Sequence, residues 1–260
     1  VLYRSNAQSR AFEEALVAAR IPYRVYGGLR FFERAEIKDA LAYLRLTQTR
    51  SDDVSFERVV NLPTRGIGQT TLDKVRELAR QRELPLWDAS AAALPSLPQR
   101  AAAALLGFLQ LVDRLAEAVG GQPLQEQVRQ VIEASGLRDH HAREKDNKGE
   151  ARVENLDELV NAAEAFEPEP GDELPPLASF LAHATLESGE MQAAQGSDYV
   201  QLMTLHSAKG LEFPTVFLVG LEEGLFPSER SAFDLEKLPE ERRLCYVGIT
   251  RARRELILTS

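Results

Sequence analysis

The chain has 260 residues, of which 44% are hydrophobic and 27% charged, values typical of a folded, soluble protein of one large domain or two ordinary ones. No run approaches the ~18 apolar residues of a transmembrane helix, and the first residues lack the pattern of a secretory signal peptide. A single cysteine excludes an internal disulfide framework, so we expect a protein of the reducing cytoplasm without a membrane partner. The four histidines show no ligand spacing, so no metal site is expected.

The formal net charge of -9 argues, taken alone, against a nucleic-acid partner. The charges are unevenly distributed, however. Residues 139–198 hold 15 acidic and 4 basic side chains, whereas residues 1–82 hold 15 basic and 10 acidic ones. A basic surface and an acidic surface can coexist on one chain, so a nucleic-acid partner is permitted.

The first residues, VLYRS, predict a strand, and apolar positions at helical spacing predict a helix over residues 11–20. A second strand is predicted in IPYRVY, residues 21–26. Strand, helix and strand joined by short connections are typical of a parallel sheet.

From about Leu29 helical patterns dominate the sequence. The predicted helices span residues 34–48, 69–83, 99–119, 123–135, 151–166 and 176–188. The acidic, proline-rich segment 167–176 predicts a mobile surface loop.

At about Val200 the strand pattern returns in YVQLMTL, TVFLVGL and ELILTS, with a helix predicted over roughly 239–253. We therefore predict an α/β fold: a parallel-sheet domain, residues 1–28 and 197–260, interrupted by a mostly α-helical inserted domain, residues 29–196. The two ends of the insertion must lie close together, because the sheet domain closes around them.

A polar loop, LHSAKGLEF, separates two of the predicted core strands. In a parallel sheet the ligand crevice lies beyond the carboxyl ends of the strands, where this loop is placed. Lys209 offers a cation for a phosphate, Gly210 permits close backbone approach, and Glu212 can accept hydrogen bonds from a sugar hydroxyl. Thr204 and His206 can donate to a phosphate or a base. A capped turn with a solvated lysine and glutamate explains the same residues equally well.

An arginine cluster lies in EERRLCYVGITRARREL. Guanidinium groups pair bidentately with phosphate oxygens, which suits them to a triphosphate. Arg251 follows an apolar, glycine-containing turn, where a purely solvated arginine is not needed. Glu240 and Glu241 can hold neighbouring arginines in place. The alternative is a surface helix with ion pairs, which is the commoner fate of such charge runs.

The segment RVVNLPTRGIGQTTLDKV resembles the turn of a helix-hairpin-helix. Gly66 and Gly68 would expose backbone N–H groups at a helix N-terminus, and such groups bind a DNA phosphate without reading sequence. Further donors flank this turn: Thr64, Arg65, Thr70 and Thr71. A Gly-X-Gly turn alone is a weak signal, and these flanking residues strengthen it.

Arg4 and Asn6 follow the first predicted strand, so they face the same crevice as the polar loop. The sequence has no G-x-x-x-x-G-K-[ST] motif and no acidic pair at a strand end fit to hold magnesium. Whatever nucleotide chemistry this chain serves, it supplies only part of the site.

Taken together, TLHSAKGLEF, FLVGLEEGLFP and EERRLCYVGITRARREL resemble motifs V and VI of the UvrD/Rep/PcrA family of superfamily 1 DNA helicases, and most of all its UvrD branch. Four further segments resemble the same family: YRSNAQSRAFEEAL, PYRVYGGLRFFERAEIKDALAYLRL, RVVNLPTRGIG and RVENLDELV. The resemblance covers nearly the whole chain. It implies the second RecA-like motor domain with its helical accessory insertion.

The resemblance also implies roles for single residues. Arg251 matches the arginine that reaches the γ-phosphate of ATP across the motor cleft. Lys209 and Glu212, with Gly210 between them, match groups near the phosphates and the ribose. The residues that match contacts to single-stranded DNA are Arg4, Asn6, Thr204 and His206. The residues at the duplex-binding hairpin are Thr64, Arg65, Gly66 and Gly68.

We therefore expect a fragment of an ATP-dependent 3′-5′ DNA helicase of repair and replication, the polarity resting on the resemblance alone. Its expected partners are single-stranded DNA, a duplex junction, ATP and repair proteins. ATP with Mg²⁺ would be held mainly by a first motor domain that this chain lacks, so the chain alone is expected to be inactive. Two alternatives remain: a non-enzymatic DNA- or partner-binding module, and the motor part of a helicase–nuclease.

Overall fold

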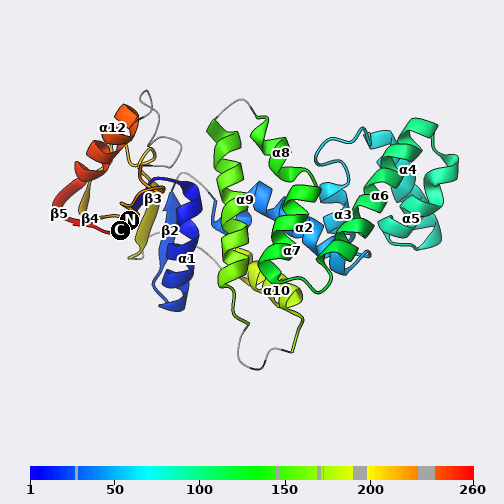
Figure 1. Cartoon of the computed structure of the whole chain (residues 1–260), viewed down its shortest axis with the longest axis horizontal. Coiled ribbons are helices and arrows are strands. Elements are labelled where there is room, and N and C mark those ends of the chain that lie inside the picture. The colour runs from blue at the N-terminus through cyan, green and yellow to red at the C-terminus, as the bar shows by residue number, and fades with distance from the viewer. Residues whose placement is uncertain (27–28, 145–146, 169–170, 172, 190–197, 228–237) are drawn as a thin grey trace. The chain divides into compact units, whose positions relative to one another are not determined.

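The computed structural model describes residues 1–26, 29–144, 147–168, 171, 173–189, 198–227 and 238–260. The chain forms two compact units (Figure 1). The sheet unit comprises Val1–Glu33 and Ser188–Ser260, and the helical unit comprises Arg34–Glu187. Residues 29–33 were predicted to open the insertion, but they pack with the sheet unit, where the backbone N–H of Phe31 donates to Glu13 at 3.3 Å. The predicted boundary at 196–197 and part of the predicted loop 167–176 lie outside the described residues.

The sheet unit has five strands: β1 (Leu2–Tyr3), β2 (Tyr23–Tyr26), β3 (Val200–Thr204), β4 (Phe213–Leu218) and β5 (Ala252–Leu258). Their order is β2-β3-β1-β4-β5, and every neighbouring pair is parallel. This confirms the predicted α/β fold with a parallel sheet. The insertion leaves the sheet after β2 and returns at the adjacent strand β3, because Tyr23 pairs with Val200. Two neighbouring strands therefore carry the two ends of the insertion.

Of the helices that the structure describes, α1 (Ser9–Ala18) and α12 (Leu238–Ile249) pack on opposite faces of the sheet. On one face, Phe12 and Leu16 of α1 pack against a core that includes Tyr3 and Leu202. On the other face, Leu244 of α12 joins a core of Leu2, Met203, Leu205, Ala208, Val216, Leu218 and Phe226. The two helices therefore lie on opposite faces of the sheet, while Phe217, Ile257 and Leu258 of β4 and β5 are exposed.

The helix predicted over 239–253 is wrong at its C-terminal end. Helix α12 ends at Ile249, and β5 begins at Ala252. The turn between them is closed by the N–H of Arg251, which donates to the carbonyl of Gly248 at 3.2 Å. Arg251 therefore lies in a short connection between helix and strand rather than inside a helix.

The helical unit contains every helix that was predicted for the insertion, and Figure 1 shows them labelled. The described helices are α2 (Ala35–Gln48), α3 (Asp53–Val59), α4 (Gln69–Arg82), α5 (Leu86–Ala93), α6 (Gln99–Val119), α7 (Leu124–Ala134), α8 (Leu137–Ala142), α9 (Asn147–Ala165) and α10 (Pro176–Gly189). Helices α3, α5 and α8 were not predicted, because a run of six to eight residues is too short for a helical period to stand out.

A cluster of aromatic rings forms the centre of one part of the helical unit. Phe56, Trp87 and Phe108 pack edge to face or tilted, with ring centres 5.5–6.4 Å apart, and Tyr43 lies 6.5 Å from Phe108. Offset and edge-to-face arrangements are those that aromatic pairs prefer. Among the described residues no helix is long and apolar enough to cross a membrane.

Candidate functional site

The polar loop begins with a hydrogen-bonded turn at the end of β3. The Thr204 hydroxyl accepts the backbone N–H of Ser207 at 3.2 Å and lies 3.0 Å from the Ser207 hydroxyl. The backbone N–H of Ala208 donates to the carbonyl of Thr204 at 3.0 Å. Thr204 itself is buried. Its hydroxyl therefore shapes the loop, and its predicted contact with DNA stays a prediction.

Gly210 turns the chain back toward β4. Its φ of +86° lies in the left-handed region, which a residue with a Cβ adopts only with strain. Lys209 and Gly210 are both exposed. Within the part of the chain that the structure describes, the Lys209 ammonium has no carboxylate partner. This loop thus presents a cation and a bare backbone segment to solvent.

The guanidinium of Arg251 lies against the same loop. Its Nη1 donates to the carbonyl of Leu211 at 2.8 Å, its Nε to the carbonyl of Val247 at 2.9 Å, and its Nη2 to the Thr250 hydroxyl at 3.0 Å. All three acceptors are neutral, and no carboxylate pairs with Arg251 in the described ranges. The arginine is therefore held in place at the end of α12 with its positive charge uncompensated.

Glu212 forms an ion pair that the sequence analysis did not anticipate. Its Oε2 lies 3.0 Å from Nε of Arg253, and both side chains are more than half exposed. An exposed pair of this kind contributes only about 0–1 kcal/mol. Glu212 follows Gly210 by two residues, and its carboxylate is held by a weak interaction that a ligand can replace.

Arg4 lies at the end of β1 and reaches across to α12. Its Nε lies 3.1 Å and 3.0 Å from the two carboxylate oxygens of Glu241, and its Nη2 lies 2.8 Å from Oε1. Glu241 is buried, with 5% of its side chain exposed, and Arg4 is partly buried. The expectation that Glu240 and Glu241 hold neighbouring arginines is met by Glu240, which pairs with Arg243 at 3.1 Å. Glu241 instead holds the distant Arg4.

The chain after Arg4 is fixed by a short 3₁₀ turn, Asn6–Gln8. The side-chain carbonyl of Gln8 accepts the backbone N–H groups of Arg4 and Ser5, each at 2.9 Å. Asn6 is half-buried at the start of this turn. Arg4 and Asn6 therefore share one rigid connection between β1 and α1.

His206 follows Thr204 and is exposed. Loss of surrounding water, and then the positive charge of Arg4, lower the pKa of His206 below its ordinary value of 6.5. The charges of Glu240 and Glu241 oppose this shift. The imidazole is therefore mostly neutral at pH 7 and lies within electrostatic reach of the Arg4–Glu241 pair.

In the helical unit, the predicted hairpin forms the connection into α4. The side-chain oxygen of Asn61 accepts the N–H groups of Arg65 at 2.8 Å and Ile67 at 3.2 Å. Gly66 adopts a φ of +81°, and Gly68 caps the N-terminus of α4. The residues exposed in this hairpin are Thr64, Gly66, Gly68, Gln69 and Thr70.

The side chain of Arg65 turns away from that exposed edge. Its Nη1 donates to the carbonyl of Pro63 at 2.9 Å and its Nη2 to that of Ser135 at 3.0 Å. The guanidinium carbon also lies 5.7 Å from the ring centre of Tyr43 and 5.6 Å from that of Phe108. The structure thus gives Arg65 a packing role, and its predicted contact with DNA stays a prediction.

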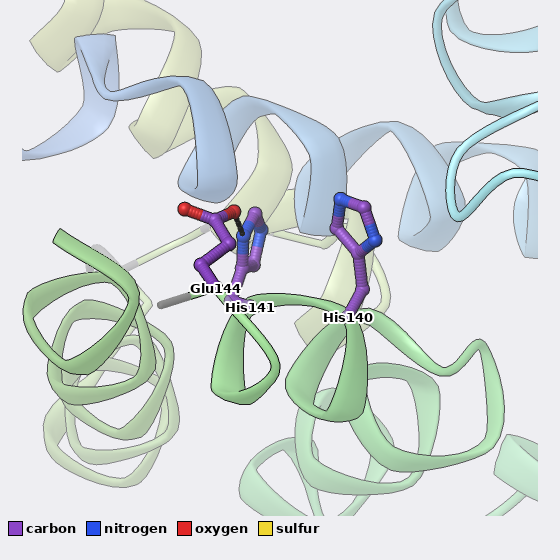
Figure 2. A group of neighbouring side chains, drawn as sticks. All are labelled: His140, His141 and Glu144. Carbon is purple, nitrogen blue, oxygen red and sulfur yellow. Dashed lines mark hydrogen bonds and ion pairs between the residues drawn. The ribbon is translucent and has the colours of Figure 1, made fainter. Parts of the chain in front are cut away.

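Figure 2 shows a cluster that the sequence analysis did not single out, His140, His141 and Glu144. Nδ1 of His141 lies 2.8 Å from Oε1 of Glu144, and Nη1 of Arg152 lies 2.7 Å from the same oxygen. The hydrogen bond with His141, together with Arg152, lowers the pKa of the Glu144 carboxyl. Because the Glu144 carboxylate is already paired with the guanidinium of Arg152, we interpret the cluster as a hydrogen-bonded connection between α8 and α9. The adjacent histidines followed by a glutamate three residues later were its only sequence signal.

The whole length of the chain is similar to known helicases. The family model described as the UvrD-like helicase C-terminal domain matches residues 1–94 and 112–260. The chain is 58% identical over 262 residues to "DNA helicase II" of Escherichia coli (strain K12), 43% identical over 266 residues to "ATP-dependent DNA helicase PcrA" of Leuconostoc citreum, and 42% identical over 267 residues to the protein of that name in Bacillus subtilis (strain 168). Each match covers 100% of this chain but 36% of the relative, so the chain spans about a third of the length of these relatives.

Proposed function

Because this chain belongs to the family of UvrD-like helicase C-terminal domains, we propose that it is part of an ATP-dependent DNA helicase. In that protein the sheet unit forms the second RecA-like motor domain, and the helical unit forms an accessory domain inserted into it. One observation carries the proposal: neutral acceptors hold the guanidinium of Arg251 in place beside the Lys209–Glu212 loop. A cation held rigidly without a carboxylate partner is suited to an anion that arrives from outside the chain.

Arg251 acts as an arginine finger. As the γ-phosphoryl group of ATP is transferred to water, negative charge is spread over its oxygens, and a preorganised guanidinium stabilises that charge in the transition state. The three hydrogen bonds that hold Arg251 reduce the reorganisation needed when the phosphate arrives. Arg251 is therefore the residue of this chain that contributes directly to hydrolysis.

Lys209, Gly210 and Glu212 bind the rest of the nucleotide. Lys209 contacts phosphate oxygens, Gly210 lets the backbone approach them, and Glu212 accepts a hydrogen bond from the ribose. The described residues of the site offer cations and one exposed carboxylate, which do not fit Mg²⁺, an ion that prefers several oxygen ligands in octahedral geometry. Mg²⁺ is held with ATP mainly by the part of the protein outside this chain.

Arg4, Asn6, Thr204 and His206 form part of the track for single-stranded DNA. They come from two adjacent strand ends, those of β1 and β3, which pair in register at Tyr3 and Thr204. Contacts to phosphates without base readout provide the sequence-independent grip that a motor needs. We further propose 3′-5′ movement, a role in repair and replication, and repair proteins as partners.

The accessory domain grips the duplex junction through its hairpin. Gly66 and Gly68 expose backbone N–H groups beside the N-terminus of α4, and Thr64 adds a hydroxyl. Arg65 supports this hairpin from the inside through the carbonyls of Pro63 and Ser135. Binding of this kind depends on phosphate charge and therefore weakens with salt.

The chain alone should not hydrolyse ATP, because its sequence has no P-loop. The test is to measure phosphate release by the purified chain, with and without single-stranded DNA, beside the full-length protein. DNA-stimulated release by the chain alone would contradict the proposal. If the chain were instead a binding module without a motor role, replacing Arg251 in the full-length protein would leave hydrolysis intact.

A further inference from the structure

We propose that Glu241 is a positioning residue that connects the DNA contact at Arg4 to the phosphate contact at Arg251 through α12. This inference rests on the proposed function and adds to its site a residue that touches neither DNA nor ATP. It follows from three contacts made along the length of one helix.

The first contact is the ion pair between Glu241 and Arg4. The carboxylate meets the guanidinium with both oxygens, at 3.0 Å and 3.1 Å from Nε and 2.8 Å from Nη2. This two-oxygen geometry fixes the plane of the guanidinium as well as its position. Because Glu241 is almost fully buried, its charge is costly without a cation beside it. The first turn of α12 and the end of β1 are therefore held together.

The second contact is the close packing of α12 on the sheet. A Cβ atom at Gly248 would lie 2.6 Å from Cδ2 of Leu205 and 3.2 Å from both Cδ atoms of Leu218. Leu205 is buried, and in the sequence it stands between Thr204 and His206, the two residues of β3 and its loop that are proposed to touch DNA. The helix backbone thus lies directly on that segment and cannot move independently of it.

The third contact is made beyond the C-terminal end of α12, where Arg251 donates to the carbonyls of Val247 and Leu211. Glu241 and Ile249, the last residue of α12, are eight positions apart, which corresponds to about 12 Å along a helix. A DNA phosphate that attracts Arg4 therefore pulls, through Glu241, on the N-terminal turn of α12. Arg251, the proposed arginine finger, follows the C-terminal end of the same helix.

The neighbouring residue Glu240 provides a matched control. It lies in the same turn, carries the same charge and pairs with Arg243 at 3.1 Å, but its side chain is 57% exposed. Both glutamates act on His206 and both lie near the N-terminus of α12. They differ in that only Glu241 holds Arg4.

Linkage between two binding sites is reciprocal, so ATP bound at one end must change DNA affinity at the other. The experiment uses the full-length protein and a fluorescent oligo(dT). The dissociation constant is measured with and without a non-hydrolysable ATP analogue, for the wild type, Glu241→Gln, Glu240→Gln, Arg4→Ala and the double variant of Glu241→Gln with Arg4→Ala. The ratio of the two constants is the coupling factor.

We expect a wild-type coupling factor of about 5-fold or more, typical of linked sites. Glu241→Gln should bring it close to 1, and Glu240→Gln should keep the wild-type value. Arg4→Ala should also bring it close to 1, and the double variant should change it no further, because both changes break the same connection. A role in stability alone would lower the melting temperature without changing this ratio.

The inference is overturned if Glu241→Gln keeps the wild-type coupling factor, if its effect multiplies with that of Arg4→Ala, or if the wild type shows no coupling. Should Glu241→Gln fail to fold, Arg4→Lys replaces it, because lysine keeps the charge but cannot form the two-oxygen pair. Failure of the proposed function is separate: in that case the wild type would show no DNA-stimulated ATP hydrolysis.

Discussion

Three arginines, Arg4, Arg65 and Arg251, carry the same charge in three different environments. Arg4 is paired with a buried carboxylate, Arg65 lies over aromatic rings and donates to carbonyls, and Arg251 donates only to neutral oxygens. Sequence context suggested phosphate contacts for Arg65 and Arg251, and the family resemblance implied a contact with single-stranded DNA for Arg4. Each of them has a partner distant in sequence: Glu241 lies 237 positions from Arg4, Ser135 lies 70 from Arg65, and Leu211 lies 40 from Arg251. Local patterns contain no information about these partners.

Replacement of Arg65 separates its packing role from a role in DNA binding. Arg65→Ala removes hydrogen bonds to three carbonyls and the stacking on Tyr43 and Phe108, so we expect it to lower the free energy of unfolding by about 1–3 kcal/mol. Arg80→Ala, at an exposed position on α4, should change it by less than about 0.5 kcal/mol. Urea unfolding of the purified chain measures both. Arg65 would instead be a phosphate contact if Arg65→Ala left the stability unchanged and lowered, by about one, the slope of log affinity for duplex DNA against log salt concentration.

His206 should make DNA binding depend on pH. Its pKa in the free protein is lowered, so the ring is neutral at pH 7, and a nearby phosphate favours the protonated form. Affinity for oligo(dT) should therefore rise as the pH falls from about 8 to about 6, through the unperturbed value near 6.5. The lowered pKa has the opposite effect on stability, which is full above pH 6.5 and declines as the pH falls through the folded-state pKa. His206→Gln should flatten the pH dependence of binding, and an unaltered profile would exclude a phosphate near this ring.

At the scale of single elements, two glycines in helices are expected to respond in opposite ways to alanine. A Cβ at Gly149 of α9 would lie 2.5 Å from the backbone oxygen of His141, whereas one at Gly107 of α6 would meet nothing within 4 Å. Gly149→Ala should destabilise the helical unit by about 1–3 kcal/mol, because the clash is with backbone that cannot rotate away. Gly107→Ala should stabilise it by up to about 1 kcal/mol through helix propensity. Urea denaturation of both variants is the measurement, and a stable Gly149→Ala would mean that α8 and α9 are farther apart.

The long helices were predictable because their apolar periods extend over many residues. The strands are short, and they were predictable from apolar runs joined to a helix by short connections. The order of the strands was not, since β3 lies between β1 and β2 although about 170 residues separate it from β2 in the chain. Chain order alone would have placed β1 and β2 side by side. Within the candidate site, the position of Lys209 followed from the end of the predicted strand before it, whereas the predicted helix 239–253 ran through Arg251 and in fact ends at Ile249. The pairing of Glu212 with Arg253 and of Arg4 with Glu241 required the three-dimensional fold.

At the scale of the whole molecule, the division into two units predicts independent folding of the helical unit. Residues 34–187 contain a core of their own, with fully buried side chains such as Ile37, Phe56, Phe108 and Phe180. A protein of this size with one core is expected to unfold cooperatively. Expressed alone, residues 34–187 should give a single sigmoidal urea transition by circular dichroism. A gradual, non-cooperative loss of signal would show that this unit depends on the rest of the chain.

The central claim is that this chain contributes a cation to a nucleotide bound by the rest of the protein. It is tested most directly by DNA-stimulated ATP hydrolysis in the full-length protein, comparing Arg251→Ala with Arg254→Ala, an exposed arginine on the adjoining strand. We predict that Arg251→Ala lowers kcat by about 10³-fold or more, as loss of an arginine finger does, while Arg254→Ala stays near the wild type. A kcat for Arg251→Ala that equals that of Arg254→Ala would contradict the account.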